Sequence, residues 1–189
     1  MPRLLHRLVM ALLVCAAATL PARASLPVPP AWLVAALPGC RLLGQGTFRW
    51  WGMDVYRARL WVGMSGIDPG HIGGAPFALQ LQYARDLTGR RIADESARLM
   101  EQMATTTPDR QRQWLAAMRG IFPDVRRGDT LTGLFDARAE TTEFRLDGKP
   151  IGHIAGLEFA DAFFSIWMSP RTPAPALREE LLAGSGDGP

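Results

Sequence analysis

The sequence has few of the side chains that bind metals or attack substrates. Its 189 residues include two cysteines, three histidines, one lysine and no asparagine. After residue 25, Cys40, His71 and His153 are the only cysteine and histidines left, too few for a tetrahedral site built within one chain. A single cysteine also forms no intramolecular disulfide, so Cys40 is most simply a small buried apolar residue. We therefore expect neither a metal nor a cofactor.

Nucleotide-binding and hydrolase motifs are absent as well. Gly44-Gln45-Gly46 begins like a dinucleotide-binding loop, but Arg49 stands where the third glycine belongs, and a strand instead of a helix is predicted to follow. No serine occupies a Gly-x-Ser-x-Gly elbow. These absences leave binding, interaction and cofactor-independent chemistry as the open classes.

An excess of positive charge is confined to the start of the chain. The formal net charge of +3 comes from three arginines, Arg3, Arg7 and Arg23. The rest of the chain has 18 basic and 18 acidic residues, which argues against nucleic acid as a partner because phosphate-binding surfaces need clustered positive charge. Trp50, Trp51 and Trp61 lie near arginines in the sequence. Proteins that bind single-stranded nucleic acid use the same residue types, aromatic rings for stacking and basic side chains for the backbone. Balanced charge favours a structural or ligand-binding role for these tryptophans.

Residues 1–24 are typical of a secretory signal peptide. Basic residues precede an apolar run over 8–20, and Ala22-Arg23-Ala24 resembles a cleavage site before Ser25. About 13 residues are too few to span a bilayer of roughly 30 Å as a helix. A lipid anchor at Cys15 is disfavoured because Val14 precedes it instead of a small residue. No later apolar run is long enough to span a membrane, so we expect a periplasmic or secreted protein with one domain over 25–183.

Three segments rich in aromatic and β-branched residues predict strands, at 41–50, 53–62 and 77–84. Alternate positions in the second segment form one mostly apolar face, consisting of Tyr56, Ala58, Leu60 and Val62. The third segment alternates in the same way, with Phe77, Leu79, Leu81 and Tyr83 on one face. This alternation is typical of a half-buried antiparallel sheet.

Helical periodicity replaces the alternation after residue 90. Apolar residues recur at helical spacing over 91–104, and Thr107-Pro108-Asp109 is a typical helix start, with a cap, a proline and an acid in the first turn. Acidic residues 94, 95 and 101 lie on the polar side of the first helix and indicate a solvated face. Strands are then predicted at 129–135, 141–146 and 151–155, the last two joined by an Asp147-Gly148 turn. The order indicates an α+β fold in which helices cover an antiparallel sheet.

The segment 157–168 is apolar on nearly all sides. Only Glu158, Asp161 and Ser165 are polar in it. Such a helix is deeply buried or borders an apolar cavity. A short helix over 174–183 is predicted to close the domain, and residues 184–189 form a polar, glycine-rich tail that we expect to be disordered.

Several short motifs, in this order, resemble the chalcone isomerase-like family. They are the segment 44–62 beginning Gly44-Gln45-Gly46-Thr47-Phe48-Arg49, then Leu87-Thr88-Gly89, Phe122-Pro123, Asp147-Gly148-Lys149-Pro150-Ile151-Gly152 and Ile166-Trp167-Met168-Ser169-Pro170. The resemblance implies an antiparallel sheet packed by a layer of helices, with a ligand cleft between them. The family includes plant flavonoid isomerases, fatty-acid-binding proteins and relatives that are not catalytic.

The same resemblance implies a pair of ligand-facing residues. In both plant branches an arginine follows the Gly-x-Gly turn, and its nearest match is Arg49, one residue later than the usual spacing. A second position is threonine in the isomerases and tyrosine in the fatty-acid binders, and here it is Tyr56. A guanidinium offers a planar fork of donors to a carboxylate or enolate, and a phenol adds one more. The alternative is that Arg49 lies in solvent and Tyr56 in the core.

Three further polar positions of the isomerases are hydrocarbon in this sequence, at Ile92, Leu99 and Ile166. The reaction depends on orienting a phenolic nucleophile beside a developing enolate, so their loss disfavours it. The leading hypothesis is an exported, non-catalytic protein that binds a hydrophobic anion such as a fatty acid. Candidate residues for the wall around its tail are Ile92, Leu99, Phe163, Ile166 and Trp167. The alternatives are an isomerase of a chalcone-like enone that uses Arg49 and Tyr56, and an interaction factor that uses exposed tryptophans.

Overall fold

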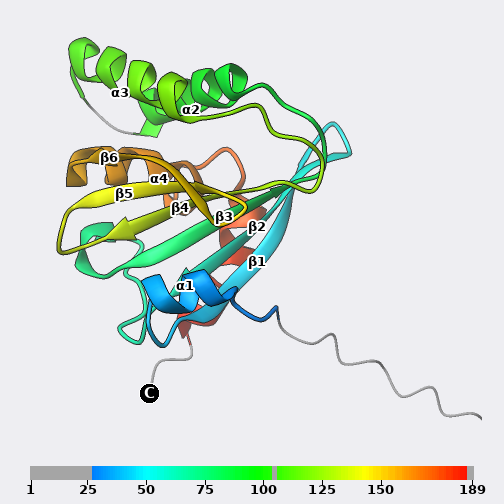
Figure 1. Cartoon of the computed structure of the whole chain (residues 1–189), viewed down its shortest axis with the longest axis vertical. Coiled ribbons are helices and arrows are strands. Elements are labelled where there is room, and N and C mark those ends of the chain that lie inside the picture. The colour runs from blue at the N-terminus through cyan, green and yellow to red at the C-terminus, as the bar shows by residue number, and fades with distance from the viewer. Residues whose placement is uncertain (1–26, 104–105, 187–189) are drawn as a thin grey trace, which may run out of the picture.

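The computed structural model describes residues 27–103 and 106–186 (Figure 1). Its centre is one six-stranded sheet in the order β1-β2-β3-β4-β5-β6, in which every neighbouring pair is antiparallel. The strands are β1 (Arg41–Trp50), β2 (Met53–Val62), β3 (Phe77–Tyr83), β4 (Thr130–Asp136), β5 (Thr141–Leu146) and β6 (Lys149–Ala155). Strands consecutive in the chain are neighbours in the sheet, so the expected antiparallel sheet is confirmed.

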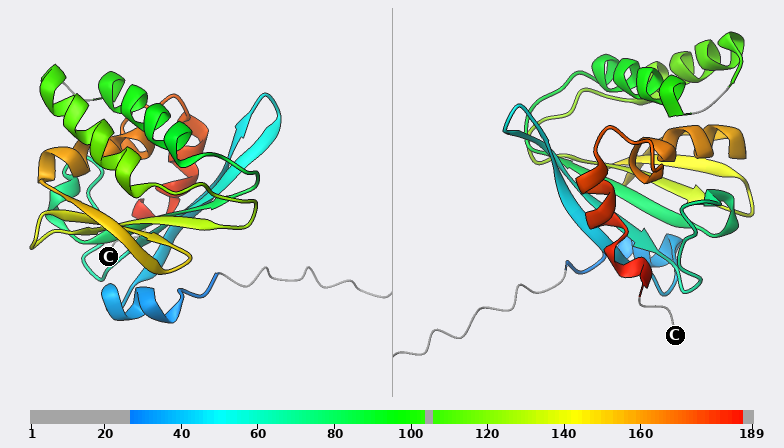
Figure 2. Two further views of the ribbon diagram at one scale, coloured as in Figure 1. Left: turned by 45° about the horizontal axis from the view of Figure 1, so that its top comes forward. Right: turned by 180° about the vertical axis from the view of Figure 1, so that it is seen from behind.

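Helices form further layers on one face of this sheet (Figures 1 and 2). Helix α4 (Leu157–Met168) packs against the sheet, and α2 (Gly89–Met103) and α3 (Pro108–Ile121) lie outside it. Helix α5 (Pro175–Leu181) crosses β1. On the opposite face, α1 (Ala31–Ala36) covers one end of the sheet. The α+β class predicted from the sequence is therefore confirmed.

Strand alternation sorts the side chains as the sequence predicted. Ala58, Leu60 and Val62 of β2 belong to the main core, together with the apolar residues of β3, Phe77, Leu79, Leu81 and Tyr83. Trp61 points to the other face, where it is 1% exposed beneath Leu33 and Leu37. Trp61 is therefore not one of the exposed tryptophans that an interaction factor would use.

Helix α4 is surrounded by apolar side chains, as its composition indicated. Eight of its twelve residues are buried. Phe163 packs with its ring centroid 5.3 Å from that of Phe144 on β5 and 5.4 Å from that of Trp167. Gly133 on β4 leaves room for the Phe164 ring, which would lie 3.2 Å from an added Cβ. Helix α4 is thus the middle layer, buried between the sheet and α2.

The Gly44-Gln45-Gly46 motif has a packing role. A Cβ added to Gly44 would lie 2.2 Å from the backbone oxygen of Glu180. At Gly46 it would lie 2.7 Å from Leu177 Cδ1. Both glycines are therefore required where α5 crosses β1, and the motif lies within a strand instead of a nucleotide-binding loop.

The two ends of the chain extend beyond the helices and strands described. The 3-10 turn η2 (Ala183–Gly186) occupies the first half of the segment expected to be a disordered tail. Residues 187–189 and the predicted signal peptide over 1–24 lie outside the described residues. Among the helices that are described, none has the length and apolar character needed to cross a membrane.

Candidate functional site

A partly buried hydrogen bond joins the sheet to α4. The indole nitrogen Nε1 of Trp167 donates a hydrogen bond to the hydroxyl oxygen of Tyr56 over 3.0 Å. Strand alternation turns Tyr56 toward the helices, and helical spacing brings Trp167 to the same place from above. Since this bond uses the tyrosine oxygen as acceptor, the O–H of Tyr56 remains a donor.

Tyr83 lies beside this contact on the neighbouring strand. Tyr56 and Tyr83 are register partners, and their ring centroids are 6.0 Å apart. Burial raises the pKa of both phenols above the ordinary value of 10.0, and the hydrogen bond from Trp167 opposes the rise for Tyr56. Within the described part of the chain, the Tyr83 hydroxyl makes no side-chain hydrogen bond. Two neutral phenols, each able to donate a hydrogen bond, therefore lie on neighbouring strands at the edge of an apolar layer.

The space between the sheet and α4 is nearly filled by protein. A cavity of about 10 Å³ remains, close to the volume of one water-sized sphere. It is lined by Leu79, Leu81, Leu131, Gly133, Phe144, Phe163 and Trp167. Phe163 and Trp167, expected to contact a ligand tail, do line this cavity. An alkyl chain would enter only if some of these side chains moved.

Arg49 is not part of this group. Its Nε donates to Asp54 Oδ1 over 2.8 Å, and the Arg49 side chain is 60% exposed. Phe48 stacks on Tyr56 at a centroid distance of 5.2 Å, which places Phe48 on the helix-covered face. The register shifts between Phe48 and Arg49, so that Arg49 pairs with Asp54 instead of Val55. The expected pair of Arg49 and Tyr56 is therefore not formed.

The two strands are irregularly paired at this point. Phe48 pairs with Tyr56, and after a shift of register Arg49 pairs with Asp54. The usual spacing of the family falls on Phe48, whose ring stacks on that of Tyr56.

The remaining predicted residues line the helix layers. Ile166 on α4 is 5% exposed, and Ile92 and Leu99 on α2 are half-buried against the main core. None of the three lines the small cavity. They pack the layers between which a tail would have to lie.

A larger and more polar pocket lies at the base of the β1–β2 hairpin. Its volume is about 250 Å³, and it is lined by Thr47, Asp54, Tyr56, Arg57, Gln82, Tyr83, Ala84, Arg127 and Gly128. Arg57 pairs in register with Thr47 and Gln82, on the face opposite the helices. The sequence did not indicate this pocket, because Arg127 reaches it from a loop 70 residues further along the chain.

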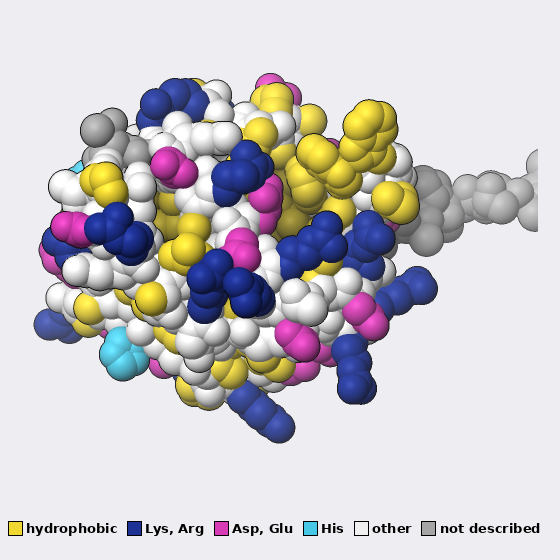
Figure 3. All heavy atoms as spheres, turned by 90° about the horizontal axis from the view of Figure 1, so that it is seen from above, with side chains coloured by type: hydrophobic (Ala, Val, Ile, Leu, Met, Phe, Trp, Pro, Cys, Tyr) yellow, Lys and Arg dark blue, Asp and Glu magenta, His cyan; other side chains and the backbone are white. Residues whose placement is uncertain are grey.

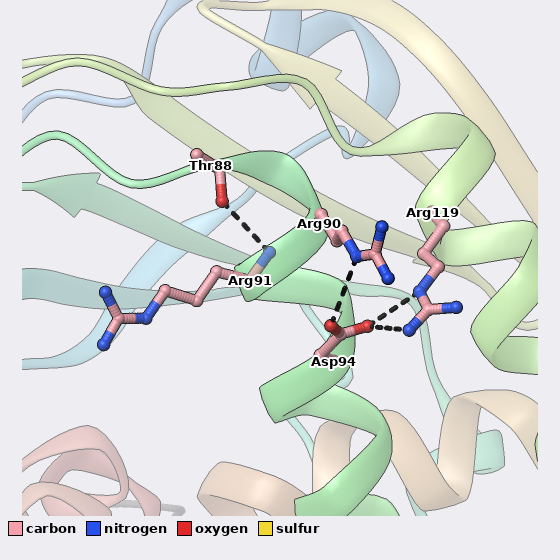
Figure 4. Close-up of polar contacts among 5 residues, drawn as sticks. All are labelled: Thr88, Arg90, Arg91, Asp94 and Arg119. Carbon is pink, nitrogen blue, oxygen red and sulfur yellow. Dashed lines mark hydrogen bonds and ion pairs between the residues drawn. The ribbon is translucent and has the colours of Figure 1, made fainter.

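One acidic residue of α2 contacts α3, while Glu95 pairs with Arg98 within α2. Asp94 accepts from Arg119 of α3 and pairs with Arg90 at 3.8 Å (Figure 4). Thr88 Oγ1 accepts from the backbone N–H of Arg91 at the start of α2.

Across residues 27–103 and 106–186, no three histidine, cysteine or carboxylate side chains are grouped to hold a metal.

Comparison with known proteins agrees with this architecture. A family described as chalcone isomerase-like matches residues 36–183. The chain belongs to this family. A crystal structure of a fatty-acid binding protein from Arabidopsis thaliana is similar to this chalcone isomerase-like chain, with a TM-score of 0.57 and 13% identity. The alignment covers 77% of this chain and 87% of that one. At this identity the likeness shows the fold alone. No curated protein sequence matches the chain.

The sequence pointed to Tyr56, and to Trp167 as part of the tail wall, but it did not single out Tyr83 in this chalcone isomerase-like protein. Tyr83 was placed on the apolar face of its strand, and Trp167 on the apolar stripe of its helix. One feature of the sequence could have indicated both residues: tyrosine and tryptophan each carry a polar atom that needs a hydrogen-bond partner when it is buried. Only the register of β2 and β3 brings the two phenols together.

Proposed function

We propose that the protein binds a hydrophobic anion, such as a fatty acid, between the sheet and α4. The observation that carries the proposal is the pair of neutral hydroxyls on Tyr56 and Tyr83 at the edge of an otherwise apolar layer. The family assignment and the likeness to a fatty-acid binding protein support it.

In this proposal the two phenols hold the headgroup. A hydrogen bond from Trp167 to Tyr56 Oη fixes the ring and directs the phenol proton elsewhere. A carboxylate accepts from both hydroxyls without displacing that bond. Hydrogen bonds to a charged group contribute about 1.5–3 kcal/mol each. Arg49 does not take this role, because its Nε donates to Asp54 Oδ1 and its side chain is 60% exposed.

The tail follows the small cavity along α4. Phe163 and Trp167 form one wall, and Leu79, Leu81 and Leu131 of the sheet form the other. Because the cavity has a volume of about 10 Å³, binding requires the rings of α4 to change rotamer or α4 to move away from the sheet. We expect slow association for this reason.

Binding is favoured over catalysis by the chemistry of the phenols. A general acid works best when its pKa is near the pH of the reaction. Burial moves the pKa of Tyr56 and of Tyr83 upward, away from neutrality. Both groups are suited to donate hydrogen bonds and poorly suited to release a proton.

The proposal is tested by the affinity of the purified protein for a fluorescent long-chain fatty acid. We expect Tyr56→Phe and Tyr83→Phe each to weaken binding by about 10-fold or more, because each removes one hydrogen bond to a charged group. Arg49→Gln is the control, because the Arg49 side chain is 60% exposed and paired with Asp54, and we expect its affinity to equal that of the unmodified protein. Absence of binding, or equal loss in all three variants, would refute the proposal.

We also propose that residues 1–24 direct export and that the chain functions outside the cytoplasm. The basic start, the short apolar run and Ala22-Arg23-Ala24 support this. Amino-terminal sequencing of the protein recovered from a periplasmic fraction is expected to begin at Ser25. Recovery of the uncut chain from the cytoplasm would contradict it.

A further inference from the structure

The β1–β2 hairpin extends beyond the rest of the sheet. Strand β3 ends at Tyr83, which pairs with Tyr56, so the turn and the strand ends around it have no third strand beside them. The hairpin projects from one end of the molecule in both Figure 1 and Figure 2. Its tip is a convex feature of the surface.

Three large apolar side chains are exposed at this tip. Trp50 is 60% exposed, Trp51 86% and Met53 50%. The two indole rings contact each other edge to face, with centroids 6.5 Å apart. Figure 3 shows hydrophobic side chains gathered at this end of the molecule, with basic side chains beside them. Single exposed apolar residues are common, but a contiguous group marks an interaction surface.

Positive charge surrounds the base of the same hairpin. Arg57 and Arg127 line the pocket of about 250 Å³, and no ion pair within the described residues involves either of them. The carboxylate of Asp54, also in the lining, is engaged by Arg49. Arg59 lies two residues from Arg57 on the same face; burial first, and then the charge of Arg57, lower its pKa.

We propose that this hairpin docks on the surface of a bilayer that contains anionic lipids. Trp50, Trp51 and Met53 enter the interface, where tryptophan is favoured because its ring is apolar and its N–H polar. Arg57 and Arg127 meet lipid phosphates, for which the guanidinium fork is well matched.

The spacing along the hairpin suits this arrangement. Arg57 is four positions after Met53, which is roughly 13 Å along a strand. An apolar tip inserted by about 5–10 Å therefore leaves Arg57 at the level of the headgroups. A protruding tip fits a deformable surface, whereas a protein partner would have to supply a matching cavity and two carboxylates.

This proposal goes beyond ligand binding. Tyr56 and Tyr83 also line the pocket of Arg57 and Arg127, but the exposed side chains at the tip are not part of that lining. We therefore expect a label at the tip to respond to vesicles in Tyr56→Phe and Tyr83→Phe as it does in the unmodified protein. A protein that docks but binds no fatty acid would refute only the proposed function. The reverse result would refute only the docking.

The test places a reporter at the tip of the full chain. With Cys15 and Cys40 replaced by serine, Met53→Cys is labelled with an environment-sensitive fluorophore. The matched control is Met64→Cys, because Met64 is 87% exposed and follows the opposite end of β2. Both labelled proteins carry the same residues 1–24, so any membrane affinity of that segment is shared. Vesicles contain either phosphatidylcholine alone or phosphatidylcholine with phosphatidylglycerol.

We expect the label at 53 to brighten and shift to the blue with anionic vesicles and to be quenched by lipids carrying a nitroxide, while the label at 64 does not respond. Trp50→Ser with Trp51→Ser should abolish the response. Arg57→Gln and Arg127→Gln should each weaken it roughly 5-fold, since one arginine near an anionic surface contributes about 1 kcal/mol. A silent label at 53, or equal responses at 53 and 64, would overturn the proposal and assign the tip to a protein partner. Equal binding to neutral vesicles would overturn the role of the arginines.

Discussion

Trp167 and Tyr56, 111 residues apart in the chain, share a hydrogen bond of 3.0 Å in the layer between α4 and the sheet. The bond gives the indole N–H its partner and holds the phenol ring against Phe48. It is a polar contact between α4 and the sheet, which otherwise pack through apolar side chains. The stability of the fold and the proposed binding site therefore depend on the same pair of side chains.

Removal of the phenol oxygen is expected to destabilise the fold. Tyr56→Phe leaves Trp167 Nε1 without an acceptor, and a buried donor without a partner costs about 1–3 kcal/mol. Trp167→Phe loses the bond and also leaves a space where the larger ring was. In a double-mutant cycle measured by denaturant unfolding, the two changes together should cost less than the sum of the single changes. Additive free energies of unfolding would contradict a direct interaction.

High pH is expected to unfold the protein through its tyrosines. The chain has two, Tyr56 and Tyr83, and burial raises the pKa of each above 10.0. The unfolded chain loses these protons near its ordinary pKa while the folded chain keeps them, so stability present below pH 10 falls as the pH rises above it. Absorbance at 295 nm should show tyrosinate only when circular dichroism shows unfolding. Titration of either phenol in the folded protein near pH 10 would contradict the burial.

The crossing of α5 over β1 is expected to be intolerant of any side chain at Gly44. Gly44→Ala places a Cβ 2.2 Å from the backbone oxygen of Glu180, and forced overpacking costs about 1–3 kcal/mol. Gly120→Ala is the control, because no atom lies within 4 Å of an added Cβ at that position in α3. The control should be neutral or more stable by up to about 1 kcal/mol. Thermal unfolding of the two variants tests the difference, and similar melting temperatures would contradict the close approach.

A buried threonine of β5 is expected to limit stability. Thr142 is fully buried, and its Oγ1 has no hydrogen-bond partner among the described residues. Its register partners are Phe135 and Ile154, so the hydroxyl lies among apolar side chains. Thr142→Val keeps the shape and removes the polar atom, which should raise the free energy of unfolding by about 1 kcal/mol or more. Glu179→Gln on α5 is a control for a change at the surface, because Glu179 is exposed, and a loss of stability in Thr142→Val would indicate a partner for the hydroxyl.

Periodicity in the sequence predicted most of the fold. Alternation placed the apolar faces of β2 and β3, and Thr107-Pro108 marked the start of α3, where Thr107 Oγ1 accepts from the N–H of Arg110. These features are local, since each depends on residues a few positions apart. The Asp147-Gly148 turn belongs to the same class, with both residues at positive φ.

The candidate site was predicted less well because it depends on register. The sequence offered Arg49 as a ligand contact, but a shift of register after Phe48 pairs Arg49 with Asp54. The ion pair with Asp54 could be suspected from their proximity in the chain, yet the turn geometry decides it. The pocket formed by Arg57 and Arg127 joins a strand to a distant loop, and no local pattern indicates such a meeting.

The order of side chains along the chain determined by itself which residues are buried. A spacing of two positions fixes the buried face of a strand, and a spacing of three to four positions fixes that of a helix. The tertiary structure alone decided which polar atoms meet inside: the indole of Trp167 with the phenol of Tyr56, and that phenol beside Tyr83. The physical reason is that hydrophobic burial is non-directional and can be read from composition and period. A hydrogen bond requires two atoms about 3 Å apart in the right orientation, and only the packed chain sets that distance.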